Sequence, residues 1–320
     1  MHAILARQSG GPEVLESVEV ERPTPGPGQL LVKVAATGIN FIETYQRGGM
    51  YKVAYPFTPG SEAAGTVEEL GEGVEGFTVG SRVATAEGQQ CYAEYTVLDA
   101  DKALPVPDGV DLLTAAALPL QGMTAHYLIN SSFRVEPGQT VLVHAGAGGV
   151  GLLITQLLKT RGARVITTVS TDEKEDLARA AGADEVLRYD GFADAVRQLT
   201  NGAGVDVVYD GVGKDTFDGS LASLRTRGFL VLFGAASGAV PPVDPQRLNA
   251  GGSLSLTRPK LADFLANPQE RLWRSSEIFG AAADGTLKAR IGASYPLTDA
   301  RQAHEDLEGR RTTGKVLLVP

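Results

Sequence analysis

An apolar strand, a glycine-rich turn and an apolar helix follow one another near the middle of the chain. Thr140 to Ala145 has the pattern of a buried strand, and glycines at positions 146, 148 and 151 precede helical periodicity over 150–160. In this setting the first glycine permits a tight turn, the second lets the backbone approach a pyrophosphate, and the third lets helix and strand pack closely. Free N–H groups at the helix start bind phosphate. The sequence therefore predicts a dinucleotide site on Gly146, Gly148, Gly149, Val150 and Gly151.

Further strand and helix patterns alternate after this unit. Strands are expected over Arg164–Val169, Val205–Tyr209 and Phe229–Phe233, with helices over 150–160, 173–181 and 217–225. Repeated strand-helix-strand units imply a parallel sheet covered by helices on both faces. The central part of the chain is therefore expected to be an α/β, doubly wound Rossmann domain.

The first hundred residues have a different pattern. Short β-prone runs such as Leu30–Val34 and Tyr92–Val97 lie between Gly and Pro, which favours a small antiparallel β domain. The terminal run Lys315–Val319 has no following helix, so it is expected to return to that domain. We expect residues 1–121 and 264–320 to form the β domain and residues 122–263 to be inserted in it.

The end of the second central strand discriminates between dinucleotides. An acidic residue there would bind a ribose 2′-hydroxyl and favour NAD, but this strand ends in Ser170. Asp172 and Glu173 are expected to cap and charge the next helix instead. Lys174, with the hydroxyl groups of Ser170 and Tyr189, suits a 2′-phosphate, so the sequence predicts NADPH.

Composition excludes several other classes of protein. A net charge of −9 disfavours nucleic acid and anionic membranes, and no run of about eighteen apolar residues occurs. The single cysteine, Cys91, excludes an internal disulfide and a multi-cysteine metal site, and the four histidines are scattered, so no metal is expected. No signal peptide is readable, which predicts a cytoplasmic protein. His144 is interpreted as a packing residue, and Gly309–Lys315 is rejected as a phosphate loop because Val316 replaces Ser or Thr.

The whole chain resembles the zinc-free quinone oxidoreductases of the medium-chain dehydrogenase/reductase superfamily, which include zeta-crystallin. The resemblance rests on Gly38–Tyr45, Pro59–Gly65, Ala145–Gly151, Thr257–Pro259 and Thr313–Val316. It implies a GroES-like β domain carrying the inserted Rossmann domain. Zinc-dependent relatives carry ligands at the positions of Asn40 and Ser61 and near Gln121, and all three ligands are absent here.

The resemblance also implies roles for individual residues. Asn40 and Thr124 would lie near the nicotinamide, and Tyr45 and Tyr51 would line the substrate cleft. Phe233 and Gly234 would border the nicotinamide ribose, and Arg310 is a further candidate cofactor contact. Ser170 and Gly211 depart from the residues common in relatives, glycine and serine. A homodimer is expected through the edge strand near Ser253–Thr257.

The expected reaction is metal-free hydride transfer from NADPH to a quinone. Asn40, Tyr45 and Tyr51 are the candidate catalytic residues, as donors of hydrogen bonds to the acceptor oxygen. Two alternatives stay open: reduction of an enal, enone or enoyl thioester, and a non-catalytic NADPH-binding protein of the crystallin kind. The identity of the proton donor is also open.

Overall fold

The computed structural model describes all residues from Met1 to Pro320. Contacts divide the chain into two compact units: unit 1 comprises Met1–Met123 and Asn267–Pro320, and unit 2 comprises Thr124–Ala266. The sequence placed the divisions after residues 121 and 263. None of the helices combines the length and the apolar composition that a membrane span requires.

Unit 2 is built on a six-stranded parallel sheet with the strand order β10-β9-β8-β11-β12-β13. Its strands are β8 (Thr140–Val143), β9 (Arg164–Thr168), β10 (Glu185–Leu187), β11 (Val205–Asp210), β12 (Leu224–Leu232) and β13 (Ser255–Thr257). This is the strand order of a dinucleotide-binding doubly wound sheet. Strands are added on one side of β8 as far as β10, and from β11 onward they are added on its other side. The expected Rossmann domain is confirmed.

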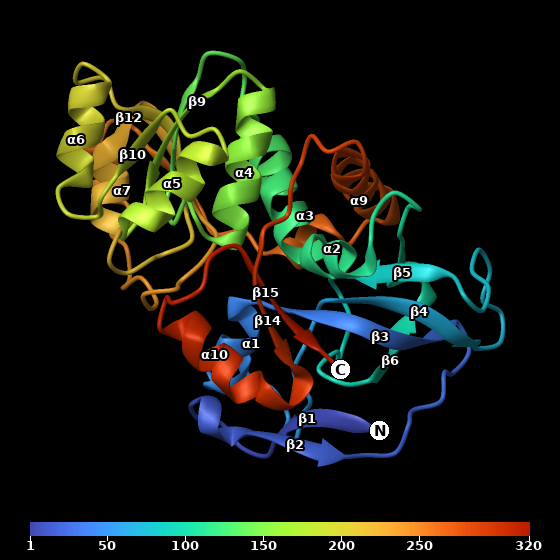
Figure 1. The fold of residues 1–320 in the computed structure, drawn as a ribbon. Helices are drawn as coiled ribbons and strands as arrows, with labels where there is room; N and C mark the ends of the chain where they lie inside the picture. Colours follow the sequence, from blue (N-terminus) through green and yellow to red (C-terminus); the bar gives the residue numbers. More distant parts are fainter. The chain divides into compact units, whose positions relative to one another are not determined.

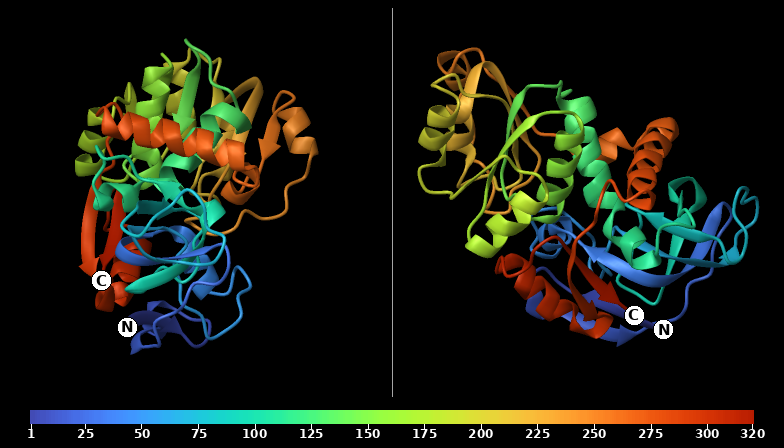
Figure 2. Two further views of the ribbon diagram at one scale, coloured as in Figure 1. Left: turned by 90° about the vertical axis from the view of Figure 1, so that its right-hand side faces the viewer. Right: turned by 45° about the horizontal axis from the view of Figure 1, so that its top comes forward.

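Helices flank this sheet on either side (Figures 1 and 2). They are α4 (Gly149–Thr160), α5 (Asp172–Ala180), α6 (Phe192–Leu199) and α7 (Phe217–Ser223), with the short α8 (Gln246–Ala250) before β13. Helix α4 packs with α5 and α6 packs with α7. Right-handed crossovers place these two pairs on opposite faces of the sheet. A π-helical turn (Leu128–Ser132) and a 3-10 turn (Leu261–Phe264) complete the unit.

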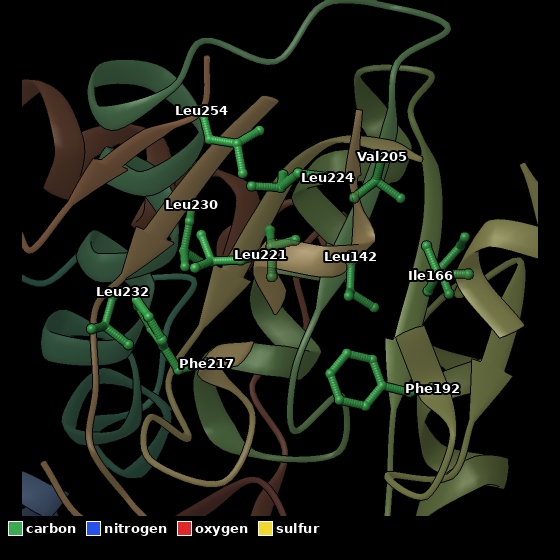
Figure 3. Packing of buried hydrophobic residues seen from close by; sticks show 12 residues of the cluster. Leu142, Ile166, Phe192, Val205, Phe217, Leu221, Leu224, Leu230, Leu232 and Leu254 are labelled. Carbon is green, nitrogen blue, oxygen red and sulfur yellow. The ribbon is translucent and has the colours of Figure 1, made fainter. Parts of the chain in front are cut away.

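The core under α6 and α7 consists of large aliphatic and aromatic side chains. Leu142 of β8 and Ile166 of β9 share one cluster with Phe192 of α6 and with Phe217 and Leu221 of α7 (Figure 3). Burial of a side chain of this size stabilises the fold by about 1.5 to 3 kcal/mol. The strand ends are therefore held rigidly, which fixes the loops that follow them.

Most predicted boundaries in unit 2 differ from the structure by one or two residues, and the start of β12, expected at Phe229, differs most. Helix α7 ends at Ser223, and β12 begins at Leu224 where a helix was expected to continue to residue 225. The spacing of Phe217, Leu221 and Leu224 fits one helix face, but Leu224 pairs with Val205 of β11. Strand pairing therefore overrides the local helical pattern.

Unit 1 contains a two-stranded sheet and a seven-stranded sheet. The strands are β1 (His2–Ala6), β2 (Leu15–Glu19), β3 (Gln29–Ile39), β4 (Ala63–Leu70), β5 (Arg82–Thr85), β6 (Tyr95–Asp99), β7 (Leu104–Pro105), β14 (Ile291–Pro296) and β15 (Lys315–Val319). Strand β15 pairs antiparallel with β3, so the predicted return of the terminal strand is confirmed. The pairing of β14 with β15 is parallel, and β6 begins at Tyr95 rather than Tyr92, so the expected all-antiparallel sheet and early strand start were wrong.

The helices of unit 1 lie around the larger sheet (Figure 1). They are α1 (Phe41–Arg47), α2 (Leu112–Ala117), α9 (Pro268–Ala283) and α10 (Ala300–Glu308), with short 3-10 turns at Pro12–Val14, Ala100–Lys102 and Leu297–Asp299. Helix α3 (Pro119–Tyr127) runs across the division between the units. Burial of Leu297, Ala300 and Ala303 against Val316 and Leu318 holds α10 on β15. Because Ile39 belongs to the same cluster, the ends of β3 and β15 are thereby fixed.

Candidate cofactor site and buried polar network

The glycine loop of unit 2 leads directly into α4 with its backbone N–H groups exposed to a ligand. Gly148 is the N-cap of α4, and no side chain caps the helix. The first N–H groups of a helix have no partner within it, so those of Gly149, Val150 and Gly151 remain available to an anion. The N–H of Gly148 itself donates to the carbonyl of Ala145 at 2.8 Å.

Close packing explains two of the glycines. A Cβ on Gly146 would lie 2.1 Å from Oγ1 of Thr167, and a Cβ on Gly151 would lie 2.1 Å from the carbonyl oxygen of Ala145. The latter approach is to rigid backbone, so no larger residue fits at position 151 without moving the loop. The donor set and its shape fit a pyrophosphate.

The predicted cofactor residues of unit 2 follow the carboxyl ends of neighbouring parallel strands. Tyr189 comes after β10, Ser170 after β9, the glycine loop after β8, and Phe233 with Gly234 after β12. Carboxyl ends of parallel strands share one edge of a sheet, and ligands of open α/β sheets bind at that edge where the strand order reverses. The structure thus brings these residues to the expected edge. Thr124, on α3, is buried.

The turn between β9 and α5 places a cation beside a hydroxyl group. Nζ of Lys174 lies 3.4 Å from Oγ of Ser170. Thr171, not Asp172, is the N-cap of α5, and its side chain accepts a hydrogen bond from the N–H of Lys174. Arg188 pairs with Asp172 and with Glu175, which neutralises acidic groups in the first turn. The site therefore presents positive charge and hydroxyl groups.

His144 is part of a buried hydrogen-bonded chain below this edge. Its Nδ1 lies 2.8 Å from Oγ1 of Thr168 and its Nε2 lies 3.0 Å from Oγ of Ser220. Ser220 donates to Oδ2 of the fully buried Asp210 at 2.8 Å. Burial lowers the pKa of His144, which favours the neutral ring. The interpretation of His144 as a packing residue is confirmed, and its ring stacks near that of Tyr189, with centroids 6.2 Å apart.

The loop after β11 lies close to the one after β12. A Cβ on Gly211 would lie 2.8 Å from the Phe233 ring, and a Cβ on Gly234 would lie 2.4 Å from the carbonyl oxygen of Gly211. Glycine at position 211 thus leaves room for the Phe233 ring in its present position.

Arg310 lies in unit 1, exposed on the turn between α10 and β15, with a φ of 58°. Because strand β15 follows this turn, the rejection of a phosphate loop at Gly309–Lys315 is confirmed.

In unit 1, strand register brings three polar side chains together. Val316 of β15 pairs with Ile39 of β3, and Ala63 of β4 pairs with Thr37 of β3. The next residues along these strands are Lys315, Asn40 and Glu62, so all three lie at one end of the sheet. A Cβ on Gly38 would lie 2.3 Å from Oε2 of Glu62 and 2.7 Å from Nζ of Lys315. Glycine at position 38 therefore makes room for this ion pair.

The three side chains form a closed buried set. Nζ of Lys315 donates to Oδ1 of Asn40 at 2.7 Å and to Oε2 of Glu62. The amide nitrogen of Asn40 donates to Glu62 at 2.8 Å and to the carbonyl of Gly38 at 3.3 Å. Gln121 donates to Oδ1 of Asn40 at 3.4 Å. Asn40 is only 5% exposed, so its side chain is fixed by protein contacts.

Glu43 extends this network from α1. Its carboxylate accepts hydrogen bonds from the N–H of Asn40 at 2.7 Å, from the N–H of Ser61 at 3.2 Å and from Oγ of Ser61 at 3.0 Å. Glu43 is fully buried, and burial raises its pKa from 4.5 to about 7.

Tyr45 and Tyr51 form an aromatic pair at the surface of the same unit. Their ring centroids lie 5.7 Å apart in an edge-to-face arrangement, and the N–H of Tyr51 donates to the carbonyl of Tyr45 at 3.1 Å. Phe41 packs beside Tyr45 with a centroid distance of 6.3 Å. Tyr51 is 42% exposed, which leaves its ring open to a ligand.

The unit 1 donor set does not resemble a metal site. No group of three His, Cys, Asp or Glu residues that could hold a metal ion is found. The cation of this network is the ammonium group of Lys315, which donates hydrogen bonds to Asn40 and Glu62. That the reaction needs no metal stays a prediction.

Glu43, Glu62 and Lys315 lie in segments that carry the family resemblance, but no role was predicted for them from the sequence. A charged residue beside an apolar strand appears in each of Gly38–Tyr45, Pro59–Gly65 and Thr313–Val316. These two acidic residues and one basic residue were the available signal. Their convergence depends on strand register, which one sequence does not specify.

The structure is that of a two-domain, dinucleotide-dependent oxidoreductase. It has a glycine loop on a doubly wound sheet, Lys174 in the turn after the second strand of that sheet, and a second unit built on β-strands. Family models agree with this class. Residues 26–108 match the alcohol dehydrogenase GroES-like domain, and residues 149–263 match the zinc-binding dehydrogenase domain. The expected GroES-like domain is confirmed.

The curated relatives are similar along their whole length. The quinone oxidoreductase of Pseudomonas aeruginosa is 43% identical, with 97% of each chain covered. A 2-haloacrylate reductase of Burkholderia is 40% identical, with 99% of this chain and 98% of the relative covered.

Solved structures agree. A mycobacterial protein complexed with NADPH is 53% identical with a TM-score of 0.98, and all of both chains is covered. The Escherichia coli quinone oxidoreductase complexed with NADPH is 40% identical with a TM-score of 0.98, again over all of both chains. The chain belongs to the quinone oxidoreductase family of the medium-chain dehydrogenase/reductase superfamily.

Proposed function

We propose that this protein is an NADPH-dependent quinone oxidoreductase that acts without a metal. The observation that carries the proposal is the alignment of Tyr189, Ser170, the glycine loop and Phe233 along one carboxyl edge of the parallel sheet. Full-length similarity to quinone oxidoreductases, three of which are more than 40% identical to this chain, supports the choice of acceptor.

The residues of unit 2 would hold the cofactor by its phosphates and ribose. The N–H groups of Gly149, Val150 and Gly151 would bind the pyrophosphate, with Gly146 and Gly148 shaping the turn. Ser170, Lys174 and Tyr189 would bind the 2′-phosphate through charge-assisted and hydroxyl hydrogen bonds. Phe233 and Gly234 would border the nicotinamide ribose, and Thr124, Asn40 and Arg310 are proposed as further contacts.

Bound NADPH supplies the hydride, and the chain must orient the acceptor and stabilise the oxygen that gains charge. The exposed ring of Tyr51, packed on Tyr45, suits stacking and hydrogen bonding to a quinone. Asn40 donates its amide hydrogens to Glu62 and Gly38, so we propose that it acts through its fixed position.

The test is NADPH oxidation with 1,4-naphthoquinone, 2-cyclohexenone and crotonyl-CoA, measured side by side with the purified protein. The proposal requires the highest kcat/KM with the quinone, and activity that persists after dialysis against a chelator. Faster turnover of either alkene would overturn the choice of acceptor. Tight NADPH binding without turnover of any acceptor would instead favour a non-catalytic binding protein.

Reduction of a conjugated alkene is the second candidate function. The 2-haloacrylate reductase that is 40% identical over nearly the whole chain carries this possibility. In this reaction the acceptor is not a quinone, and the hydride adds to a carbon atom of a C=C bond that is conjugated to a carbonyl group. The same three-acceptor assay separates the two reactions.

We also propose a homodimer formed through β13, the last strand at its edge of the parallel sheet. Ser255 is exposed on this strand, and an unpaired strand edge is a template for pairing with a second copy. Light scattering of the native protein and of Ser255→Pro tests this, since proline removes an N–H donor. A monomeric native protein would rule out the dimer. A cytoplasmic location is proposed from the single cysteine.

A further inference from the structure

Unit 1 buries two carboxyl groups but only one cation in the network around Asn40. Glu43, Glu62 and Lys315 are each at most 1% exposed. Lys315 forms its ion pair with Glu62, while no Lys or Arg side chain pairs with Glu43. A buried carboxylate without a cation partner is costly, so Glu43 is held as a group that takes up a proton readily.

Glu43 has a single hydroxyl partner, and that partner reaches the surface. Oγ of Ser61 lies 3.0 Å from Oε1 of Glu43, and Ser61 is partly exposed. A serine hydroxyl both donates and accepts, so the bond can reverse. When Glu43 is protonated, its O–H donates to Oγ of Ser61, and the serine hydrogen is released to point elsewhere.

We propose that Glu43 and Ser61 form a proton relay that protonates the reduced acceptor, with Ser61 as the contacting donor and Glu43 as the buried reservoir. The relay rests on the proposed reductase function. It assigns the proton donor, whose identity the sequence left open.

The relay completes the balance of the reaction. A hydride adds two electrons and one hydrogen nucleus to the quinone, which leaves a hydroquinone monoanion. Oγ of Ser61 gives its proton to the anionic oxygen as the O–H bond of Glu43 breaks and a new O–H bond forms on Ser61. The resulting carboxylate of Glu43 takes one proton from solvent along the same route before the next turnover.

The environment of Glu43 supports this role. Burial raises its pKa to about 7, so that protonated and ionised forms are both accessible near neutral pH. Lys315 of β15 opposes the rise and Glu62 adds to it. The negative charge of Glu43 also raises the pKa of Cys91 and of Tyr92, which lie in the segment before β6. Arg47, on the same helix as Glu43, instead forms an ion pair with Glu308 and a hydrogen bond with His304, both on α10.

Ser61→Ala is the cleanest test because it removes the hydroxyl and leaves the N–H bonds of Ser61 and Asn40 to Glu43 intact. We expect kcat with 1,4-naphthoquinone to fall about 100-fold, the scale of general acid catalysis, with the NADPH dissociation constant unchanged. Ser61→Thr keeps the hydroxyl and should restore most of the loss. Ser17→Ala, at an exposed position on β2, is the matched control.

The pH profile separates a relay from a structural role. In the native protein kcat should fall as the pH rises through the titration of Glu43, and Ser61→Ala and Glu43→Gln should lose this dependence. Infrared difference spectra of the ligand-free protein should show a carboxyl C=O band that grows as the pH falls and is absent in Glu43→Gln. That measurement needs neither cofactor nor activity.

Two results would overturn the relay while leaving the proposed function standing: unchanged kcat and pH profile in Ser61→Ala, or no Glu43 carboxyl band in the native protein. Absence of NADPH oxidation by the native protein with any acceptor would overturn the proposed function and, with it, the role of the relay. A folded Ser61→Ala protein, shown by an unchanged urea midpoint, makes the kinetic comparison valid.

Discussion

Nζ of Lys315 lies 2.7 Å from Oδ1 of Asn40, although 275 positions separate the two residues along the chain. The contact arises because β15 returns beside β3 and pairs Val316 with Ile39. It fixes the orientation of the Asn40 amide, since the oxygen must face the ammonium and the nitrogen must face Glu62. A flipped amide would place two donors together.

Lys315→Met should therefore destabilise the protein strongly. Removing one partner of a buried ion pair typically costs about 3 to 5 kcal/mol, because Glu62 is left with an uncompensated charge. Urea unfolding measures the loss. The double variant Lys315→Met/Glu62→Gln should recover part of it, while Lys52→Met, at an exposed position, should change little. Equal losses for the two lysine variants would contradict this account.

Gly151→Ala should abolish NADPH binding. The new Cβ would lie 2.1 Å from the carbonyl oxygen of Ala145 and 2.9 Å from Cα of Gly146, so the loop must move away from its phosphate-binding shape. Fluorescence titration measures the dissociation constant. Gly280→Ala is the matched control, since open space surrounds that helical position and alanine favours a helix by up to about 1 kcal/mol. Unaltered binding in Gly151→Ala would show that the loop does not hold the cofactor.

The sequence predicted the doubly wound sheet because its signals are local. Thr140–Val143 and the glycines after it specify strand, turn and helix start within a few residues, and the structure has β8 and α4 there. The end of α7 was predicted wrongly because Leu224 fits the helical spacing but pairs with Val205. The local hydrophobic period does not show whether a residue will continue a helix or pair with a distant strand.

The candidate site was predictable to different degrees in the two units. Residues of unit 2 follow strand ends in chain order, so a known sheet order places them on one edge. The network of Lys315, Glu62 and Glu43 depends on which strands of unit 1 pair and in what register. Pairing between strands that lie far apart in the sequence depends on the packing of the whole core. The charged residues could therefore be identified from the sequence, but their proximity could not be predicted.

Lys174→Ala should weaken NADPH binding much more than NADH binding. Loss of a hydrogen bond to a charged group costs about 1.5 to 3 kcal/mol, which is roughly a 10- to 150-fold rise in the NADPH dissociation constant. Since NADH lacks the 2′-phosphate, its titration with the same variant is the internal control. A parallel loss for both cofactors would remove Lys174 from the 2′-phosphate site.

His304 should make the protein less stable in mild acid. Its Nδ1 lies 2.9 Å from Nη1 of Arg47 and its Nε2 lies 3.1 Å from the hydroxyl of Tyr92, with no exposed surface. Burial, with Arg47 adding to it, lowers the pKa of His304 from 6.5 to about 3. The neutral ring is therefore the folded form, and the unfolded chain binds the extra proton.

The sign of this effect follows from proton linkage. Stability due to His304 is fully present above about pH 6.5 and is lost as the pH falls toward its folded pKa, by ~2 kcal/mol between about pH 6.5 and pH 5. Urea midpoints measured across this range should fall more steeply for the native protein than for His304→Gln, which has no group to protonate. His2→Gln, at an exposed position, should keep the native slope. Parallel slopes for the native protein and His304→Gln would mean that the ring is already protonated in the fold, which its contact with Arg47 opposes.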